Sequence, residues 1–213
     1  AEVSRRTGSA IAEALREKGY NAVEVELVPE KLVEQLREID AKVVFNAVHG
    51  MYGEDGRLQS ILEAIKMPYT GSGVLASAVA MDKVATKRFL ISANISTPKC
   101  LMYNKRFDND MAKIEKEIIA TFGVPVVIKA ADQGSSIGVE IVKEEADVAA
   151  ALENTFKYSD LVLVEECING KELTCGVMEV ERELKALPIV MIAPHSGSYD
   201  FHSKYTKGAT DYL

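Results

Sequence analysis

The sequence predicts an α/β fold in which a domain with a parallel sheet precedes a small α+β unit and a further sheet of paired strands. Two observations carry this prediction. In the first part of the chain, helical segments alternate with short apolar runs, as in a parallel sheet with helical connections. Farther along, β-branched runs flank short polar loops and are separated by amphipathic helices, as in small α+β units.

Composition narrows the class of protein. The chain has 213 residues, of which 47% are hydrophobic and 27% charged, and its formal net charge is −7. This is ordinary globular composition, and an acidic chain without Lys/Arg runs is a poor candidate for binding nucleic acid or an anionic membrane. The longest nearly uncharged apolar stretch, 74–81, is too short to span a bilayer, and no signal peptide is visible.

The cysteines and histidines follow no disulfide or zinc pattern. The cysteines lack a C-x-x-C pair and stand in apolar surroundings, so we expect reduced core or near-core thiols in a cytoplasmic protein. The three cysteines are Cys100, Cys167 and Cys175, and the three histidines are His49, His195 and His202. None of them, and no other residue, is assigned as a metal ligand.

The N-terminal domain is expected to contain two helix–strand pairs. Ser4 is the expected N-cap of a helix that ends at Gly19, and a second helix follows Pro29. Segments 23–28 and 43–45 are the expected strands. A parallel sheet of this kind normally begins with a strand, so we expect one to precede the first helix in the natural domain.

Residues 46–56 form the first candidate site. Loops at the carboxyl ends of parallel strands are where α/β folds bind ligands, and this loop combines three glycines with His49, Glu54 and Asp55. It is interpreted either as a substrate loop or as a turn whose acids cap a helix over 57–65.

Lys83 stands near the start of a helix expected to end near residue 93, which follows another over 74–80. The helix macrodipole disfavours a cation at this position, and a bound anion would reverse that effect. Taken alone, the residue is better explained as a solvated lysine.

The stretch 129–139 is the motif around which the chain is organised. Apolar runs over 124–128 and 139–142 read as strands on either side of a small, polar loop bracketed by glycines. Such a loop can direct backbone N–H groups at an anion, and Lys129 adds a positive charge where the first strand ends. We interpret the motif as a nucleotide phosphate loop; the alternative is an ordinary Gly/Ser hairpin with a surface lysine.

Two better-known motifs compete for this loop. G-x-S-x-G at 134–138 fits the nucleophile elbow of α/β hydrolases, with Ser136 as nucleophile, but that elbow leads into a helix and a strand is expected here. The pattern G-x-x-x-x-G-K-[ST] is absent from the sequence. A phosphate site would therefore belong to another nucleotide fold.

Acidic residues end the next buried strand, 161–164. Glu165 and Glu166 follow it directly, and acids at a strand end are costly to bury unless they are paired or liganded. A ribose or an adenine amine would meet that need, and so would solvent. The remaining expected elements are a strand near 99–103, helices over 108–122 and 144–156, paired strands over 173–180 and 186–192, and a mobile active-site loop over 195–213.

Six ordered blocks carry a resemblance over essentially the whole chain. They are V-H-G-x-x-G-E-D-G at 48–56, P-Y-T-G-S-G at 68–73, M-D-K at 81–83, K-x-x-x-x-G-S-S-x-G at 129–138, V-E-E at 164–166 and Y-D-x-x-x-K-Y at 199–205. In order and spacing they closely resemble the D-alanine–D-alanine ligases of the ATP-grasp superfamily.

The resemblance implies an architecture of three parts. Residues 1–82 would form a Rossmann-like α/β domain that binds substrate. Residues 83–168 would form the small ATP-grasp subdomain with the phosphate loop, and residues 169–213 the truncated start of the C-terminal ATP-grasp subdomain.

The resemblance also implies an activity. In this family ATP phosphorylates the carboxylate of one D-alanine, and the amine of a second attacks the acyl phosphate to give a dipeptide for peptidoglycan. The implied ligands are ATP, Mg²⁺ and D-alanine, with Mg²⁺ drawing charge from the phosphates and a lid excluding water. A cytoplasmic homodimer is implied as well.

The implied nucleotide-binding residues are Lys83, Lys129, Ser136, Glu165, Glu166, Cys167, Ile168, Glu172 and Lys204. Among them the three lysines would contact phosphates. Glu165 would meet the adenine amine, the backbone of Glu166 and Ile168 the adenine edge, and Glu172 the ribose.

The implied catalytic residues are Ser135, Tyr205 and His49. Ser135 would orient both the second substrate and the catalytic tyrosine, Tyr205. His49 would lie near the second substrate.

The sequence departs from the family pattern at both ends. The glutamate for the amine of the first D-alanine would precede residue 1, and no E-x-N for Mg²⁺ occurs in these 213 residues. Gln133 and Ala130 replace a usual glutamate and proline. We therefore expect this chain not to catalyse alone. The alternatives are another ATP-grasp carboxylate–amine ligase and a nucleotide-binding module without catalysis.

Overall fold

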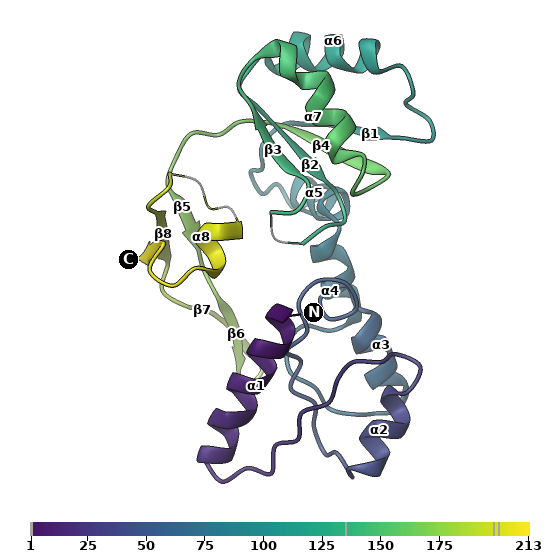
Figure 1. Cartoon of the computed structure of the whole chain (residues 1–213), viewed down its shortest axis with the longest axis vertical. Helices are drawn as coiled ribbons and strands as arrows, with labels where there is room; N and C mark the ends of the chain where they lie inside the picture. Colours follow the sequence, from purple (N-terminus) through teal and green to yellow (C-terminus); the bar gives the residue numbers. More distant parts are fainter. Residues whose placement is uncertain (1, 135, 198, 200) are drawn as a thin grey trace.

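The computed structural model describes residues 2–134, 136–197, 199 and 201–213. Its elements form three groups that follow one another along the chain (Figure 1). Helices from the N-terminal part lie at one end of the molecule, and a four-stranded sheet with its helices lies at the other. A group of short strands lies to one side (Figure 1).

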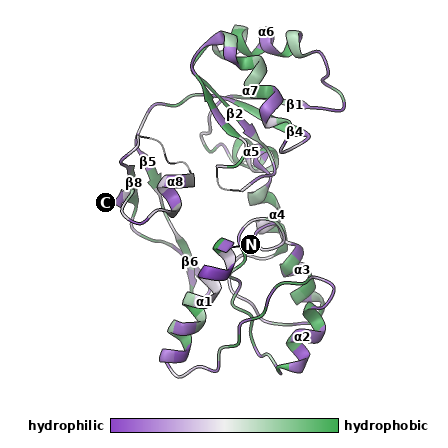
Figure 2. Ribbon diagram, in the orientation of Figure 1, coloured by the Kyte–Doolittle hydropathy of each residue, from purple (hydrophilic) through white to green (hydrophobic). Residues whose placement is uncertain are grey.

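The N-terminal group consists of helices around a small core. These helices are α1 (Glu2–Glu17), α2 (Leu32–Glu38), α3 (Arg57–Ala64) and α4 (Val74–Met81). α1 carries charged residues along its length, and Figure 2 shows purple stretches of its ribbon between white and green ones. Leucines four positions apart on α2 and α3 form one buried cluster, because residues at that spacing share a helix face. They are Leu32, Leu36, Leu58 and Leu62.

Two predicted strands of this group form no ladder in the described part of the chain. Residues 23–28 instead contact α1 through side chains, including the ion pair between Arg5 and Glu26 (2.7 Å). Residues 43–45 make a single parallel bridge, at Val44. These two element predictions were wrong because β-branched composition favours an extended chain but does not supply the hydrogen-bonded neighbour that makes a strand.

The second group is a four-stranded sheet in which every neighbouring pair is antiparallel. Its strands are β1 (Cys100–Asn104), β2 (Val126–Ala130), β3 (Val139–Val142) and β4 (Leu161–Glu166), in the order β1-β4-β2-β3. The accompanying helices are α5 (Lys83–Ser92), α6 (Met111–Phe122) and α7 (Val148–Thr155), with the 3₁₀ turn η1 (Glu145–Asp147) before α7. Most of the predicted boundaries agree with these to within a few residues.

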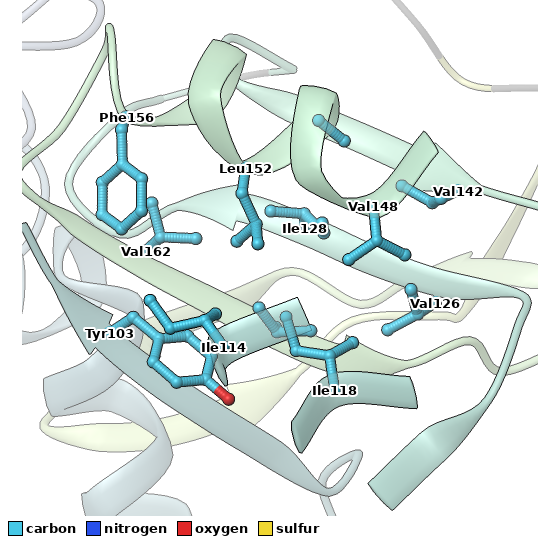
Figure 3. Packing of buried hydrophobic residues seen from close by; sticks show 12 residues of the cluster. Tyr103, Ile114, Ile118, Val126, Ile128, Val142, Val148, Leu152, Phe156 and Val162 are labelled. Carbon is cyan, nitrogen blue, oxygen red and sulfur yellow. The ribbon is translucent and has the colours of Figure 1, made fainter. Parts of the chain in front are cut away.

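The main core lies where α6 and α7 cover one face of this sheet. Side chains from both helices meet side chains from the central strands, and Ile118, Leu152, Ile128 and Val162 are completely buried there (Figure 3). The cluster is wholly hydrophobic apart from the hydroxyl of Tyr103. Burial of this size is the main source of stability for the group.

The opposite face of the sheet carries the polar residues of the candidate site. Burial alternates along β2, and successive strand residues point to opposite faces, so Lys129 points away from the main core. α5 packs on this second face, where Val84, Ala131 and Leu163 form a small apolar cluster. The sheet thus separates an apolar layer from a layer that can hold charged groups.

The third group contains the predicted pairing of residues 173–180 with 186–192, in two separate ladders. β5 (Glu172–Thr174) pairs with β8 (Val190–Pro194), and β6 (Val177–Val180) pairs with β7 (Glu183–Ala186). The tail, expected to be an irregular loop, contains α8 (Phe201–Tyr205) and β9 (Thr210–Tyr212), which pairs with β8. Elements this short leave no periodic signal in the sequence.

The burial of the cysteines and the length of the apolar helices can be compared with the predictions. Cys100 and Cys167 are partly buried, but Cys175 is exposed on the third group, so the prediction of a near-core thiol was wrong there. Among the helices that the structure describes, none has the length and apolar character needed to cross a bilayer.

Candidate nucleotide and substrate site

The central motif folds as a strand, a tight loop and a strand, as predicted. β2 and β3 form an antiparallel hairpin in which Lys129 lies opposite Val139. Gly138 has a φ of +63°, and a Cβ added to it would lie 2.8 Å from the Cβ of Ala130, so only glycine fits this position. Because strand β3 follows the loop, the strand-to-helix turn of a hydrolase nucleophile elbow is not formed at Ser136.

Lys83 attaches the start of α5 to this loop. Its Nζ donates to the backbone oxygens of Gln133 (2.6 Å) and Ala130 (3.1 Å), and its backbone N–H donates to Ala131 (2.9 Å). Burial, followed by the nearby charge of Lys129, lowers the pKa of Lys83 from its ordinary value. The helix itself is capped by Asp82, which accepts from the backbone N–H groups of Val84 and Ala85. An anion beside this lysine would favour its charged form.

Glu165 lies between two lysines on the same face of the sheet. Its Oε2 pairs with Nζ of Lys129, and its Oε1 lies 2.6 Å from Nζ of Lys87. The side chains of Glu165 and Lys87 are 6% and 5% exposed, whereas that of Lys129 is 28% exposed. The cluster therefore carries one excess positive charge, and Lys129 is the member that reaches solvent.

The charge of Glu165 is stabilised by these neighbours. Burial acts to raise the pKa of its carboxyl, but the hydrogen bonds and charges of Lys129 and Lys87 outweigh that effect and leave the pKa below its ordinary value. The carboxylate is thus ionised near neutral pH even though it is buried. Of the alternatives that the sequence left open for these strand-end acids, pairing is the one observed for Glu165.

The loop at 46–56 is held together by hydrogen bonds from its own acids and amides. Glu54 accepts from the backbone N–H of Gly50 (2.8 Å), and Asp55 accepts from those of Tyr52 (2.9 Å) and Arg57 (3.1 Å). The alternative in which the acids cap the following helix is therefore confirmed for Asp55, which contacts the first residue of α3.

His49 faces α1. Its Nε2 lies 3.0 Å from the hydroxyl of Thr7, and its Nδ1 lies 3.7 Å from Oε1 of Glu54. Its backbone N–H donates to the hydroxyl of Ser4 (3.1 Å). Ser4 lies inside α1, so its predicted role as N-cap was wrong, and its hydroxyl positions this loop instead.

The loop at 46–56 and the loop of the β2–β3 hairpin lie against each other. A Cβ built on Gly134 would be 3.7 Å from Oε2 of Glu54 and 3.9 Å from Cα of Gly50. Two segments that stand far apart in the sequence are thus brought to one place. This contact joins the N-terminal group to the hairpin.

Gly53 anchors the loop at 46–56, and replacing it with alanine is expected to lower the free energy of unfolding by about 1–3 kcal/mol. A Cβ at this buried position would lie 2.0 Å from the backbone oxygen of Val48, and backbone cannot move aside as a flexible side chain can. The carbonyl of Gly53 also accepts from Asn46 (2.7 Å) and Gln59 (2.8 Å). Urea unfolding would measure the loss.

Gly170→Ala is the matched control for this substitution. A Cβ at Gly170 would have no heavy atom within 4 Å. Equal stability of the two variants would contradict the close packing at Gly53.

The tail contacts the loop of the β2–β3 hairpin. The hydroxyl of Ser136 donates to the backbone oxygen of Tyr199 (3.3 Å), and Nζ of Lys204 lies 5.1 Å from the centre of the Tyr199 ring. Ser135 lies outside the described residues. Tyr205 ends α8, but its side chain is likewise outside what the structure describes.

The four residues proposed for the adenine edge and ribose lie at the end of β4 and after it. Glu166 ends that strand, where its Oε1 accepts from the backbone N–H of Lys99 (2.8 Å). Cys167 is partly buried, and Ile168 is 65% exposed. Glu172 begins β5 and is exposed. The structure therefore ties Glu166 to the start of β1 and leaves Ile168 and Glu172 open to solvent.

Lys87 was missed by sequence reasoning. It stands one helical turn after Lys83, which is the signal that could have revealed it, because residues four apart share a helix face. A lysine on an amphipathic helix is usually solvent-exposed, and nothing local in the sequence indicates that this one is buried.

Comparison with protein families decides the relationship. A family model described as "D-ala D-ala ligase C-terminus" matches residues 89–213, and one described as "D-ala D-ala ligase N-terminus" matches residues 22–72. The chain belongs to the D-alanine–D-alanine ligase family. The resemblance drawn from its sequence blocks is thereby confirmed.

Relatives within the D-alanine–D-alanine ligase family agree over the whole chain. Proteins named D-alanine–D-alanine ligase from Syntrophotalea carbinolica and Moorella thermoacetica are 44% and 42% identical over 213 residues, all of this chain. The chain spans about two thirds of their length, 65% and 68% respectively.

A solved structure supports the same fold. The crystal structure of D-alanine–D-alanine ligase from Bacillus anthracis complexed with ATP matches all of this chain and 65% of its own, with a TM-score of 0.78 and 30% identity. The predicted α/β class with an ATP-grasp fold is confirmed by this likeness. The hairpin, α5 and the end of β4 are therefore the parts of an ATP-grasp fold that lie together in this chain.

Proposed function

We propose that the full-length protein containing this chain is an ATP-dependent ligase that joins two D-alanines into D-alanyl-D-alanine through an acyl phosphate, for peptidoglycan synthesis. One observation carries the proposal for this chain in particular. Lys83 and Lys129 converge on the phosphate-loop hairpin, beside the buried carboxylate of Glu165. In a member of this family, that arrangement fits a nucleoside triphosphate.

The donor set suits ATP. Two lysines and the backbone N–H groups of a glycine-bracketed loop attract phosphate oxygens, and the lower-dielectric surroundings strengthen that attraction. Glu165 accepts from two lysines, but each carboxylate oxygen has two lone pairs, so capacity remains for an adenine amine. We assign the adenine edge to the backbone of Glu166 and Ile168, which stand at the end of β4 and just after it. Cys167, between them, is assigned to the nucleotide site.

Other assignments rest on the contacts between segments. Ser136 and Lys204 are proposed near the phosphates because the tail touches the loop there. His49 is proposed near the second substrate because its loop lies against Gly134. Three assignments rest on the family pattern alone. Glu172 is proposed to bind the ribose, Ser135 to orient the second substrate, and Tyr205 to act in catalysis.

The part of the chain that the structure describes offers no ready-made cluster of metal ligands. Among the described residues, no group of three or more His, Cys, Asp or Glu side chains is arranged to hold a metal ion. We therefore derive no step through Mg²⁺ from this chain.

A cytoplasmic location and a homodimer are proposed on the family resemblance, and gel filtration would test the dimer.

The proposed division into domains follows the clusters of buried residues. Residues 1–82 contain the leucine cluster of α2 and α3, and 83–168 contain both clusters on the faces of the four-stranded sheet. Residues 169–213 contain the short ladders of β5 to β9. Limited proteolysis that cuts near residues 82 and 168 would support these boundaries.

Phosphate release from ATP by the full-length gene product tests the function. With Mg²⁺ and D-alanine, release and formation of a dipeptide are expected, and L-alanine and D-lactate serve as controls. Release with another acceptor only would retain the ligase chemistry and change the substrate. ATP binding without turnover would favour a nucleotide-binding module and overturn the proposal.

A further inference from the structure

Lys87 is a buried cation in the second turn of α5 that has no role in the assignments above. It is 4% exposed, and its Nζ contacts three acceptors: Oε1 of Glu165 (2.6 Å), the hydroxyl of Thr97 (3.0 Å) and the backbone oxygen of Pro98. An ammonium group has three donors, so all of them are used. The side chain is therefore fixed in both charge and position.

Glu165 also pairs with Lys129, which is more exposed to solvent than Lys87. Lys129 pairs with the other oxygen of Glu165, but the side chain of Lys129 is 28% exposed and stands at the end of β2, next to the phosphate loop. A lysine has four rotatable side-chain bonds and can reach a new partner without movement of the backbone. The two lysines thus differ in their freedom to leave the carboxylate.

We propose that Lys87 is a positioning residue that keeps Glu165 neutralised while Lys129 turns from the carboxylate to a nucleotide phosphate. Glu165 is sealed from water, and a buried carboxylate without a partner is strongly unfavourable. Among the residues that the structure describes, Lys87 and Lys129 are the cations paired with Glu165. If Lys87 were removed, the buried carboxylate would retain Lys129 as its partner and keep it from the phosphate. This proposal rests on the proposed function, because it needs a phosphate-bearing ligand at the loop.

The simpler role for Lys87 is a tether. Its contacts with Thr97 and Pro98 connect α5 to the segment that enters β1, and their loss would loosen the fold around the site. The two roles differ in one respect. A loosened fold weakens the binding of the nucleoside and of the phosphates together, whereas retention of Lys129 weakens the binding of phosphates alone.

The test compares the affinities of ATP and of adenosine for Lys87→Met in the full-length gene product, by calorimetric titration. We expect ATP to bind about tenfold more weakly and adenosine to change by less than about twofold, so the ratio of the two affinities falls about tenfold. An unchanged ratio, with both ligands weakened alike, would overturn the proposal in favour of the tether.

Two further variants complete the test. Thr97→Val removes one tethering contact and leaves both lysines in place, so its ratio should equal that of the wild type; a fall like that of Lys87→Met would overturn the proposal. If Lys87→Met does not fold, Lys87→Gln takes its place, since the glutamine amide can still donate to the backbone oxygen of Pro98. The same fall in the ratio of ATP affinity to adenosine affinity is expected, and an unchanged ratio would overturn the proposal. Failure of the wild-type protein to bind ATP would instead count against the proposed function.

Discussion

Replacing Glu165 with glutamine is expected to lower the free energy of unfolding by about 3–5 kcal/mol. Glutamine keeps the shape of the side chain but removes the negative charge between Lys87 and Lys129. Lys129 can turn to solvent, whereas the ammonium group of Lys87, with its side chain 5% exposed, would remain buried without a counter-charge. Urea unfolding followed by circular dichroism would measure the loss.

The control for this prediction is Glu153→Gln, on the exposed side of α7, which should change stability by less than about 0.5 kcal/mol. The double variant Lys87→Met/Glu165→Leu should recover much of the loss, because it removes the unpaired charge. A Glu165→Gln variant as stable as Glu153→Gln would show that the buried pair contributes nothing.

The same pair predicts how stability depends on pH. The pKa of Glu165 is lower in the folded protein than its ordinary value in the unfolded chain. Its contribution is therefore complete above that ordinary value and is lost as the pH falls through the folded pKa. Glu165→Gln should lack this part of the acid dependence.

Local patterns explain why the phosphate hairpin and the position of Lys83 could be predicted. Two β-branched runs around a glycine-bracketed loop specify a hairpin within a short stretch of chain. The order of the sheet could not be predicted in the same way. β1 pairs with β4 through Cys100 and Glu165, which stand far apart in the sequence, and no local signal connects them.

The polar layer of the site was predicted only in part, for a related reason. Lys129 and Glu165 were found because each stands at the end of an apolar run. Lys87 has polar and apolar neighbours typical of an exposed helix face, and it becomes buried only when α5 packs on the sheet. A tertiary contact of this kind overrides the usual preference of lysine for solvent.

Lys129→Ala is expected to weaken the binding of ATP by about 2–4 kcal/mol, which corresponds to a loss of affinity between about thirtyfold and several hundredfold. The fold should remain intact, because Glu165 keeps its ion pair with Lys87 (2.6 Å). Calorimetric titration of the full-length gene product with ATP measures the change, and thermal unfolding confirms that the variant is folded.

Lys143→Ala is the matched control for the binding experiment, because Lys143 is an exposed lysine directly after β3 of the same hairpin. It removes the same charge from the other end of the hairpin and should change the affinity for ATP by less than about threefold, since exposed charges are screened by salt. Adenosine should bind the wild-type protein and Lys129→Ala with similar affinity, because the missing contact is with phosphate. Unchanged affinity for ATP in Lys129→Ala would remove Lys129 from the phosphate site and leave its pairing with Glu165 as its only role.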